Sequence, residues 1–152
     1  MEIKIATSQF PVSANIGENK QSILTQILEA KKANVDVIHF PEGALSGYAG
    51  VDFENFGNFD WDELRQATKE IQKAAKQNNL WVILGSSHEL NSHKPHNSCY
   101  IINSSGQIVD RYDKRFCTGG DLKHFSACDH FVNFDINGVN IYCQEKLVFY
   151  LL

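Results

Sequence analysis

Short apolar runs alternate with longer segments of helical period, and this alternation limits the possible folds more than any other feature of the chain. The runs at residues 3–9, 35–40 and 80–86 predict β-strands, since they are short and rich in apolar or β-branched residues. Between them, residues 18–33 and a segment that begins at Asp60 predict helices. Strands that alternate with helices in this way predict an α/β fold, in which helices pack on one or both faces of a sheet.

The second of these helices carries the clearest local signals. Asp60 and Glu63 form a capping-box pattern, which marks the start of a helix. The positions of one helix face then follow at steps of three and four residues; they are Trp61, Leu64, Thr68, Ile71 and Ala75. The charged residues between them predict an exposed outer face; they are Lys69, Glu70, Lys73 and Lys76.

The second half of the chain predicts mainly strands. Four strands are expected in two pairs, namely residues 97–103 with 107–112, and residues 131–136 with 138–143, the latter pair joined at Asn137-Gly138. The segment between the two pairs is predicted to be irregular.

In α/β sheets ligands bind beyond the carboxyl ends of strands. This rule selects the loop after the second predicted strand and the loop after the first hairpin.

Composition sets outer limits on function. The 152 residues, 43% of them hydrophobic, are enough for one core and too few for two. Fourteen Lys and Arg against eighteen Asp and Glu leave a formal net charge of −4, so no basic footprint for nucleic acid is present. No apolar run approaches the ~20 residues of a membrane helix, and no secretory signal opens the chain, which predicts a cytoplasmic protein with no membrane partner. The four cysteines are then expected as free thiols.

Two charged residues stand out in the loops that the sheet rule selects. Glu42 follows Phe40 and Pro41 directly after a strand, where partial desolvation suits a carboxylate to act as a base. Lys114 lies just past the hairpin and could supply a fixed positive charge for an anionic intermediate. The residues alone leave a plainer interpretation open for both: Glu42 as a solvated loop carboxylate or cap, and Lys114 as one charge of a surface run at 110–115.

Three segments resemble one known family. They are FPEGALSGY at 40–48, NSCYIINSSGQIVDRYDKRF at 97–116 and FDINGVNI at 134–141. In this order they are similar to the carbon–nitrogen hydrolase (nitrilase) superfamily. The resemblance implies a four-layer α-β-β-α sandwich, so residues 1–141 are expected to form an incomplete carbon–nitrogen hydrolase domain with a partial sandwich fold.

The resemblance also implies a chemistry and the residues that perform it. Glu42 matches the family's general base and Lys114 its lysine, in a Glu-Lys-Cys mechanism that hydrolyses a small amide, carbamoyl compound or nitrile with no metal or organic cofactor. A cysteine attacks the carbon of the substrate, the glutamate moves the proton, and the lysine stabilises the tetrahedral intermediate. A second family glutamate corresponds by spacing to Asp121, and the family's Pro-Gly is replaced by Ala127-Cys128.

The nucleophile is absent from the position that the resemblance implies. Counting from Gly138 places it at residue 146, which is Lys146, whereas Cys143 stands three residues earlier and would face the other side of a strand. Residues 142–152 are therefore expected to be a tail unrelated to the family, as in a truncated or frame-shifted product that has lost the family's C-terminal half. Two interpretations of Cys143 stay open, a displaced nucleophile and a small buried side chain.

Three functions follow from these interpretations. The first is a hydrolase of non-peptide carbon–nitrogen bonds. The second is a non-catalytic fragment that keeps the Glu-Lys half-site and associates with other chains, as a homo-oligomer for example, through open sheet edges and apolar faces. The third is a metal-binding module, although closely paired cysteines are absent; its ligands would be Cys117, His124, Cys128 and His130.

Overall fold

The predicted order of strands and helices is confirmed by a computed structural model, which describes residues 2–144 and 148–151. The helices are α1 (Ile16–Lys32), α2 (Trp61–Asn78) and the short α3 (Asp121–His124), with a 3-10 turn at Phe56–Asn58. The strands are β1 (Ile5–Thr7), β2 (Val37–His39), β3 (Trp81–His88), β4 (His96–Ile102), β5 (Ile108–Asp113), β6 (Val132–Ile136), β7 (Val139–Gln144) and β8 (Val148–Leu151).

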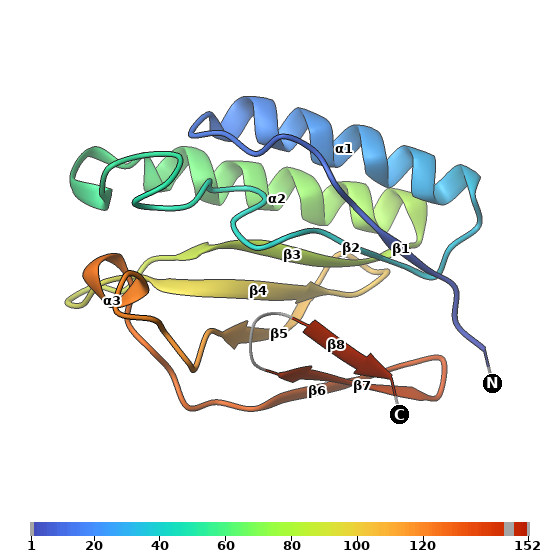
Figure 1. Cartoon of the computed structure of the whole chain (residues 1–152). Helices are drawn as coiled ribbons and strands as arrows, with labels where there is room; N and C mark the ends of the chain where they lie inside the picture. Colours follow the sequence, from blue (N-terminus) through green and yellow to red (C-terminus); the bar gives the residue numbers. More distant parts are fainter. Residues whose placement is uncertain (1, 145–147, 152) are drawn as a thin grey trace.

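The elements form three layers (Figure 1). Helices α1 and α2 pack on one face of a five-stranded sheet in the order β1-β2-β3-β4-β5. A three-stranded sheet in the order β6-β7-β8 packs on the opposite face. The described residues thus form an α-β-β arrangement, which confirms a partial sandwich as the fold class.

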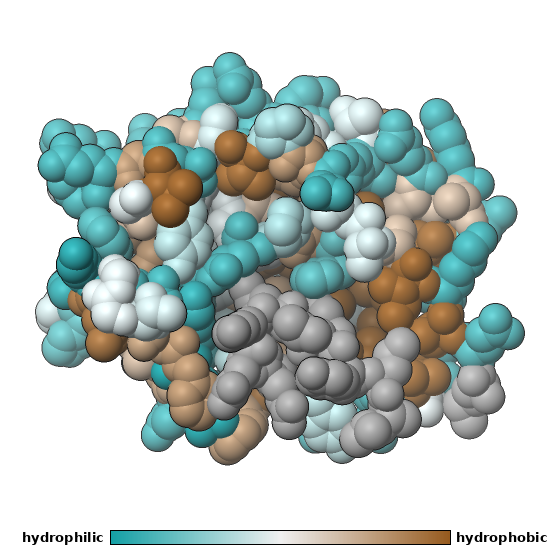
Figure 2. Space-filling view, viewed as in Figure 1, coloured by the Kyte–Doolittle hydropathy of each residue, from teal (hydrophilic) through white to brown (hydrophobic). Residues whose placement is uncertain are grey.

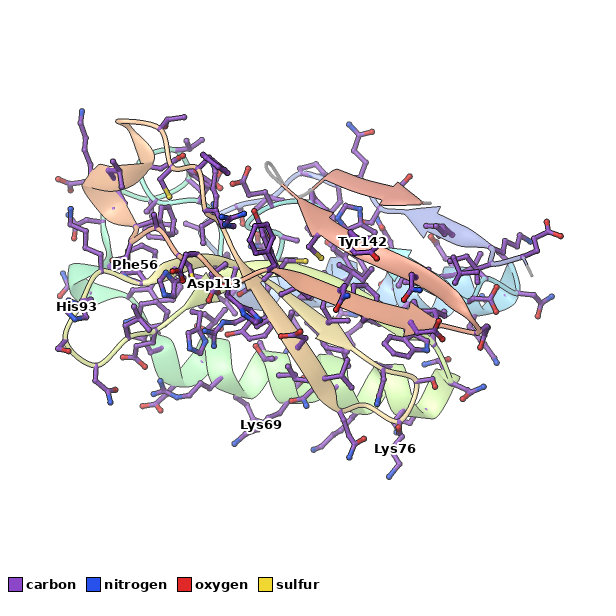
Figure 3. All side chains as sticks on the ribbon, turned by 90° about the horizontal axis from the view of Figure 1, so that it is seen from below. Phe56, Lys69, Lys76, His93, Asp113 and Tyr142 are labelled. Carbon is purple, nitrogen blue, oxygen red and sulfur yellow. The ribbon has the colours of Figure 1, made fainter. Side chains whose placement is uncertain are left out.

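The predicted helix cap at Asp60 is confirmed, and α1 begins with a cap at Asn15 that was not predicted. Asp60 accepts a hydrogen bond from the backbone N–H of Glu63 at 2.8 Å, and Asn15 does the same for Glu18 at 3.0 Å. The lysines expected on the outer face of α2 are exposed, and Figure 3 shows Lys69 and Lys76 at the surface beside this helix. Among the described residues, neither α1 nor α2 has the apolar length that crossing a lipid bilayer requires.

The chain has two apolar cores, one on each face of the five-stranded sheet, so the prediction of a single core was wrong, because the helices cover one face of the sheet and the second sheet covers the other. The first joins α1 and α2 to the sheet through fully buried side chains such as Ile23, Ile71 and Leu84. The second lies between the two sheets and includes Ile83, Tyr112 and Ile141, with further members at Val37, Cys99, Ile101, Val132, Ile136 and Cys143. The long apolar run of β3 is explained by this placement, because its alternate side chains face different cores.

The hairpin of β6 and β7 is confirmed at Asn137-Gly138, where both residues have positive φ (54° and 82°). Strand β7 continues to Gln144, so the predicted domain limit at residue 141 lies inside this strand. Strand β8 pairs antiparallel with β7 and was not predicted from the sequence. The unrelated origin of residues 142–152 stays a prediction.

Several large apolar side chains reach the surface, as expected for a partial sandwich. The most exposed are Val51, Phe131 and Phe116, at 78%, 67% and 57%. Figure 2 shows a hydrophobic patch on the side of the molecule nearest the N-terminus, beyond the largely hydrophilic helical layer. Ile5 of the edge strand β1 is also exposed. Surfaces of this kind favour association with another chain.

Strand direction places the two selected loops at the same edge of the sheet. Strands β1, β2 and β3 are parallel, whereas β4 runs antiparallel to both β3 and β5. The carboxyl ends of β2 and β5 therefore lie at one edge, together with the start of β4. Glu42 follows β2 and Lys114 follows β5, so the fold brings the ends that carry them together.

A glycine allows the loop after β2 to cross β3 at this edge. A Cβ atom at Gly85 would lie 2.0 Å from the carbonyl oxygen of Pro41 and 3.0 Å from Cα of Glu42. The loop is held in this position because the backbone N–H of Leu45 donates to the carbonyl of Gly85 at 3.0 Å. No other residue type fits at position 85 without moving Glu42.

We expect Gly85→Ala to lower the free energy of unfolding by about 2 kcal/mol or more, because its methyl group overlaps backbone atoms that cannot rotate away. Urea denaturation measures this change. Gly119→Ala is the matched control, since a Cβ there meets nothing within 4 Å, and a change below about 0.5 kcal/mol is expected. Equal effects of the two variants would contradict the close approach at Gly85.

His39 makes the stability depend on pH. Burial lowers the pKa of His39 from 6.5 to about 4, so between these values the unfolded chain binds a proton that the folded chain does not. The free energy of unfolding should therefore fall by about 3 kcal/mol as the pH drops from 6.5 to 4. In His39→Gln this part of the fall should disappear, whereas it should persist in the exposed control His93→Gln. If the free energy of unfolding depended on pH identically in the wild type and in His39→Gln, His39 would not be the cause of this pH dependence.

Candidate active site

Glu42 lies in a tightly turned loop directly after β2. The backbone N–H of Ala44 donates to Pro41 at 3.1 Å and that of Gly47 to Gly43 at 2.8 Å, which folds the loop into two successive turns. Gly43 and Gly47 have φ values of 67° and 72°, in the left-handed region that favours glycine. The loop thereby directs Glu42 toward the start of β4, where Asn97 Nδ2 donates to Glu42 Oε1 at 2.5 Å.

Lys114 approaches the same carboxylate from the end of β5. Its backbone N–H donates to the carbonyl of Asn97 at 2.8 Å, which continues the β4–β5 pairing for one more residue. Its Nζ lies 3.0 Å from Glu42 Oε1 and 3.0 Å from Asp121 Oδ2. The structure thus brings together Glu42, Lys114 and Asp121, all three of which the sequence had selected.

Tyr48 completes this network. Its hydroxyl donates to Asp121 Oδ1 and lies 3.5 Å from Lys114 Nζ. The backbone N–H of Thr118 donates to the other oxygen of Asp121 at 2.8 Å. Sequence reasoning assigned no role to Tyr48 or to Asn97. Both lie inside the segments that carry the family resemblance, Tyr48 at the end of FPEGALSGY and Asn97 at the start of NSCYIIN. Their polar side chains at these positions were the signal that could have identified them.

The charges of the network stabilise one another. Burial raises the pKa of Asp121, but hydrogen bonds from Tyr48, Thr118 and Lys114 outweigh it and hold this pKa at about 2. Burial likewise lowers the pKa of Lys114, and the hydrogen bonds with Asp121 and Glu42 reverse this and raise it above its ordinary value. Burial and the bond to Asp121 raise the pKa of Tyr48 to about 12. Near neutral pH the lysine is therefore an ammonium ion and the tyrosine a neutral donor.

Solvent access differs among the charged members. The side chains of Lys114 and Asp121 are 10% and 8% exposed, whereas that of Glu42 is 35% exposed. An incoming molecule can therefore reach Glu42 beside a fixed, largely buried positive charge. This combination suits a base that acts next to a developing negative charge.

The two thiols of interest occupy different surroundings. Cys143 lies in the core between the sheets, and burial raises its pKa to about 12, which disfavours the nucleophilic thiolate. Residue 146, where the resemblance places the nucleophile, lies outside the described residues. Cys117 was considered only as a metal ligand, but its Sγ lies 3.7 Å from the carbonyl of Lys114, and it interacts electrostatically with Asp121, Lys114 and Glu42.

The four residues of the predicted metal module do not come together. Cys117 lies beside Lys114, His124 packs against Gly50, and His130 Nε2 lies 3.4 Å from Asp110 Oδ1. In the part of the chain that the structure describes, Cys128 is grouped with a different histidine and a carboxylate. The proposed ligand set was therefore wrong, because spacing along an irregular loop does not determine which side chains converge.

Known proteins are similar to this chain in sequence and in fold. The family model for carbon-nitrogen hydrolases matches residues 4–121. Nitrilase homolog 2 of Dictyostelium discoideum is 31% identical over 113 residues, which cover 73% of this chain and 34% of that protein. The glutamine-dependent NAD(+) synthetase of Acinetobacter baylyi is 30% identical over 127 residues, covering 83% of this chain and 22% of the synthetase.

The solved structure of an amidase from Nesterenkonia sp. has the same fold, with a TM-score of 0.81 at 13% sequence identity. The match covers 92% of this chain and 54% of the amidase. The chain thus spans about a third or less of these two curated relatives and about half of the amidase. Because the family model covers most of the sequence, the chain belongs to the carbon–nitrogen hydrolase family.

Proposed function

We propose that this chain carries the site of a carbon–nitrogen hydrolase and acts on small amides, with carbamoyl compounds and nitriles as related substrates. The observation that carries the proposal is the 3.0 Å contact between Glu42 Oε1 and Lys114 Nζ at the edge where β2 and β5 end. The amidase activities named for relatives such as the omega-amidase of Mus musculus support an amide as the substrate class.

The proposed reaction is acyl transfer through a thiol. Glu42 takes the proton of the thiol as its sulfur attacks the carbonyl carbon, and Lys114 stabilises the negative charge that develops on the carbonyl oxygen. The C–N bond then breaks, and Glu42 returns the proton to the departing ammonia or amine. Water hydrolyses the resulting thioester with Glu42 again acting as the base. No metal or organic cofactor enters these steps.

Cys117 is the thiol that we assign to the attack, because its Sγ lies 3.7 Å from the carbonyl oxygen of Lys114, beside the network. Burial raises the pKa of Cys117, so deprotonation depends on transfer to Glu42 rather than on a preformed thiolate. The alternative, Cys143, is 3% exposed and lies in the core between the two sheets.

Ammonia release from a panel of small primary amides tests the proposal on the full chain. Glu42→Gln and Lys114→Met should each lower kcat/KM about a hundredfold or more, since they remove the base and the positive charge. Cys117→Ser should stop ammonia release, and Cys143→Ser should not. Matched controls are Glu54→Gln in the same loop and Lys69→Met on the outer face of α2, both exposed, and neither should alter the rate.

A second candidate is a non-catalytic fragment that pairs with other chains. The exposed Phe116 and Phe131 favour it, as does the burial of Cys143. In the same experiment this candidate predicts a folded wild-type chain that releases no ammonia and whose sedimentation shows a mass above that of the monomer.

Retention of the wild-type rate by Glu42→Gln would overturn the hydrolase proposal itself.

Tyr48 is proposed to position Lys114 through Asp121. Tyr48→Phe removes one hydrogen bond to the Asp121 carboxylate, so the pKa of Asp121 should rise from about 2 by about one unit or more. Carbon-13 NMR titration of the aspartate carboxyl groups measures this shift. Tyr142→Phe, on the exposed face of β7, should leave the pKa of Asp121 unchanged. An unaltered pKa in Tyr48→Phe would show that the tyrosine does not control this carboxylate.

A further inference from the structure

A second polar cluster lies beside the hydrolase network and contains a histidine, a carboxylate and a thiol. One ring nitrogen of His96, one carboxylate oxygen of Asp113 and Sγ of Cys128 all lie within 4.8 Å of one another. Donor atoms around a tetrahedral zinc ion are about 3.3–3.8 Å apart, since zinc–ligand distances are about 2.0–2.3 Å. The three side chains therefore need to move inward by only about 1 Å to hold an ion.

His96 has a hydrogen bond from one ring nitrogen to a backbone carbonyl. Its Nδ1 lies 2.8 Å from the carbonyl oxygen of Ser126, which only accepts hydrogen bonds, so Nδ1 carries the proton and Nε2 presents a lone pair. Histidines that bind metals commonly have this second hydrogen bond. Ser126 is itself fixed, because its N–H donates to Pro95 at 2.9 Å and its hydroxyl to Lys94 at 2.8 Å. The segment that carries Cys128 is thus tied to the start of β4.

Asp113 is held rigidly at the end of β5, inside the molecule (Figure 3), with a side chain that is 4% exposed. Its Oδ1 accepts from Ser98 Oγ at 2.5 Å and from Arg111 Nε at 2.7 Å, and its Oδ2 accepts from Arg111 Nη2 at 2.9 Å. A carboxylate has about four acceptor sites, so Oδ2 retains one for an ion.

We propose that His96, Asp113 and Cys128 form a three-ligand site for a divalent zinc ion, with the fourth position open to water. Imidazole, carboxylate and thiolate are the donors that zinc takes in proteins. Binding releases the thiol proton of Cys128 to solvent as the zinc–sulfur bond forms. The backbone N–H of Cys128 lies 3.4 Å from the carbonyl of Lys114. The bound ion therefore also stabilises the end of β5, which Lys114 directly follows. The site does not depend on the proposed hydrolase activity.

Cobalt substitution on the full chain tests the site. Co²⁺ bound at a thiolate gives a ligand-to-metal absorption band in the near ultraviolet, and one equivalent of Zn²⁺ should remove this band by displacing the cobalt. His96→Gln and Cys128→Ser should weaken zinc binding about tenfold or more, and Cys128→Ser should also abolish the band. Cys117→Ser and His124→Gln are matched controls from the same loop region, and both should keep the band and the zinc affinity.

Alkylation of the wild-type chain gives an independent measurement that needs no variant to fold. Peptide mapping after iodoacetamide treatment should show that one equivalent of Zn²⁺ protects Cys128 at least about tenfold and leaves Cys117 unprotected. A cobalt band that survives in Cys128→Ser, or equal alkylation of Cys128 with and without Zn²⁺, would overturn the site.

Discussion

The arrangement of the candidate active site depends on the contacts that the ammonium group of Lys114 makes. An ammonium ion loses several kcal/mol of hydration when it is buried, and only close opposite charge offsets this loss. Here two carboxylates, Glu42 and Asp121, each lie 3.0 Å from the nitrogen. They come from different parts of the chain, one following β2 and the other in α3. Their attraction to Lys114 therefore also anchors the irregular segment after β5 against the sheet.

Sheet geometry sets what the backbone must do for this contact to form. In the order β1-β2-β3-β4-β5, two strands separate β2 from β5, which corresponds to about 14 Å at the usual strand spacing. The loop after β2 spans this distance by passing directly over Gly85 of β3. Asn97 of β4 then meets the Glu42 carboxylate with its side chain and Lys114 with its backbone carbonyl. A bulky residue on β3 or an apolar one at the start of β4 would separate the pair.

The sequence was informative where one local pattern determines one structure. The capping box at Asp60, the Asn137-Gly138 turn and the order of strands and helices up to β7, apart from α3, were predicted correctly, because each is set by neighbouring residues. Glu42 and Lys114 were candidates because each follows a strand, and the family resemblance then selected them. The role of Tyr48 and the grouping of Cys128 with His96 and Asp113 were not foreseen, since both depend on how α3 and the loop around it fold back on the sheet. No periodicity in residues 113–130 encodes that path.

Consecutive residues at the end of β5 serve two different polar clusters, and strand geometry explains how. Side chains alternate between the two faces of a sheet, so Asp113 and Lys114 point in opposite directions. Asp113 joins Ser98 and Arg111, whereas Lys114 joins Glu42, Tyr48 and Asp121. Both depend on the same pairing of β5 with β4, which extends through the bond from Lys114 to Asn97. A change that shifts this register by one residue would exchange the two faces and dismantle both clusters together.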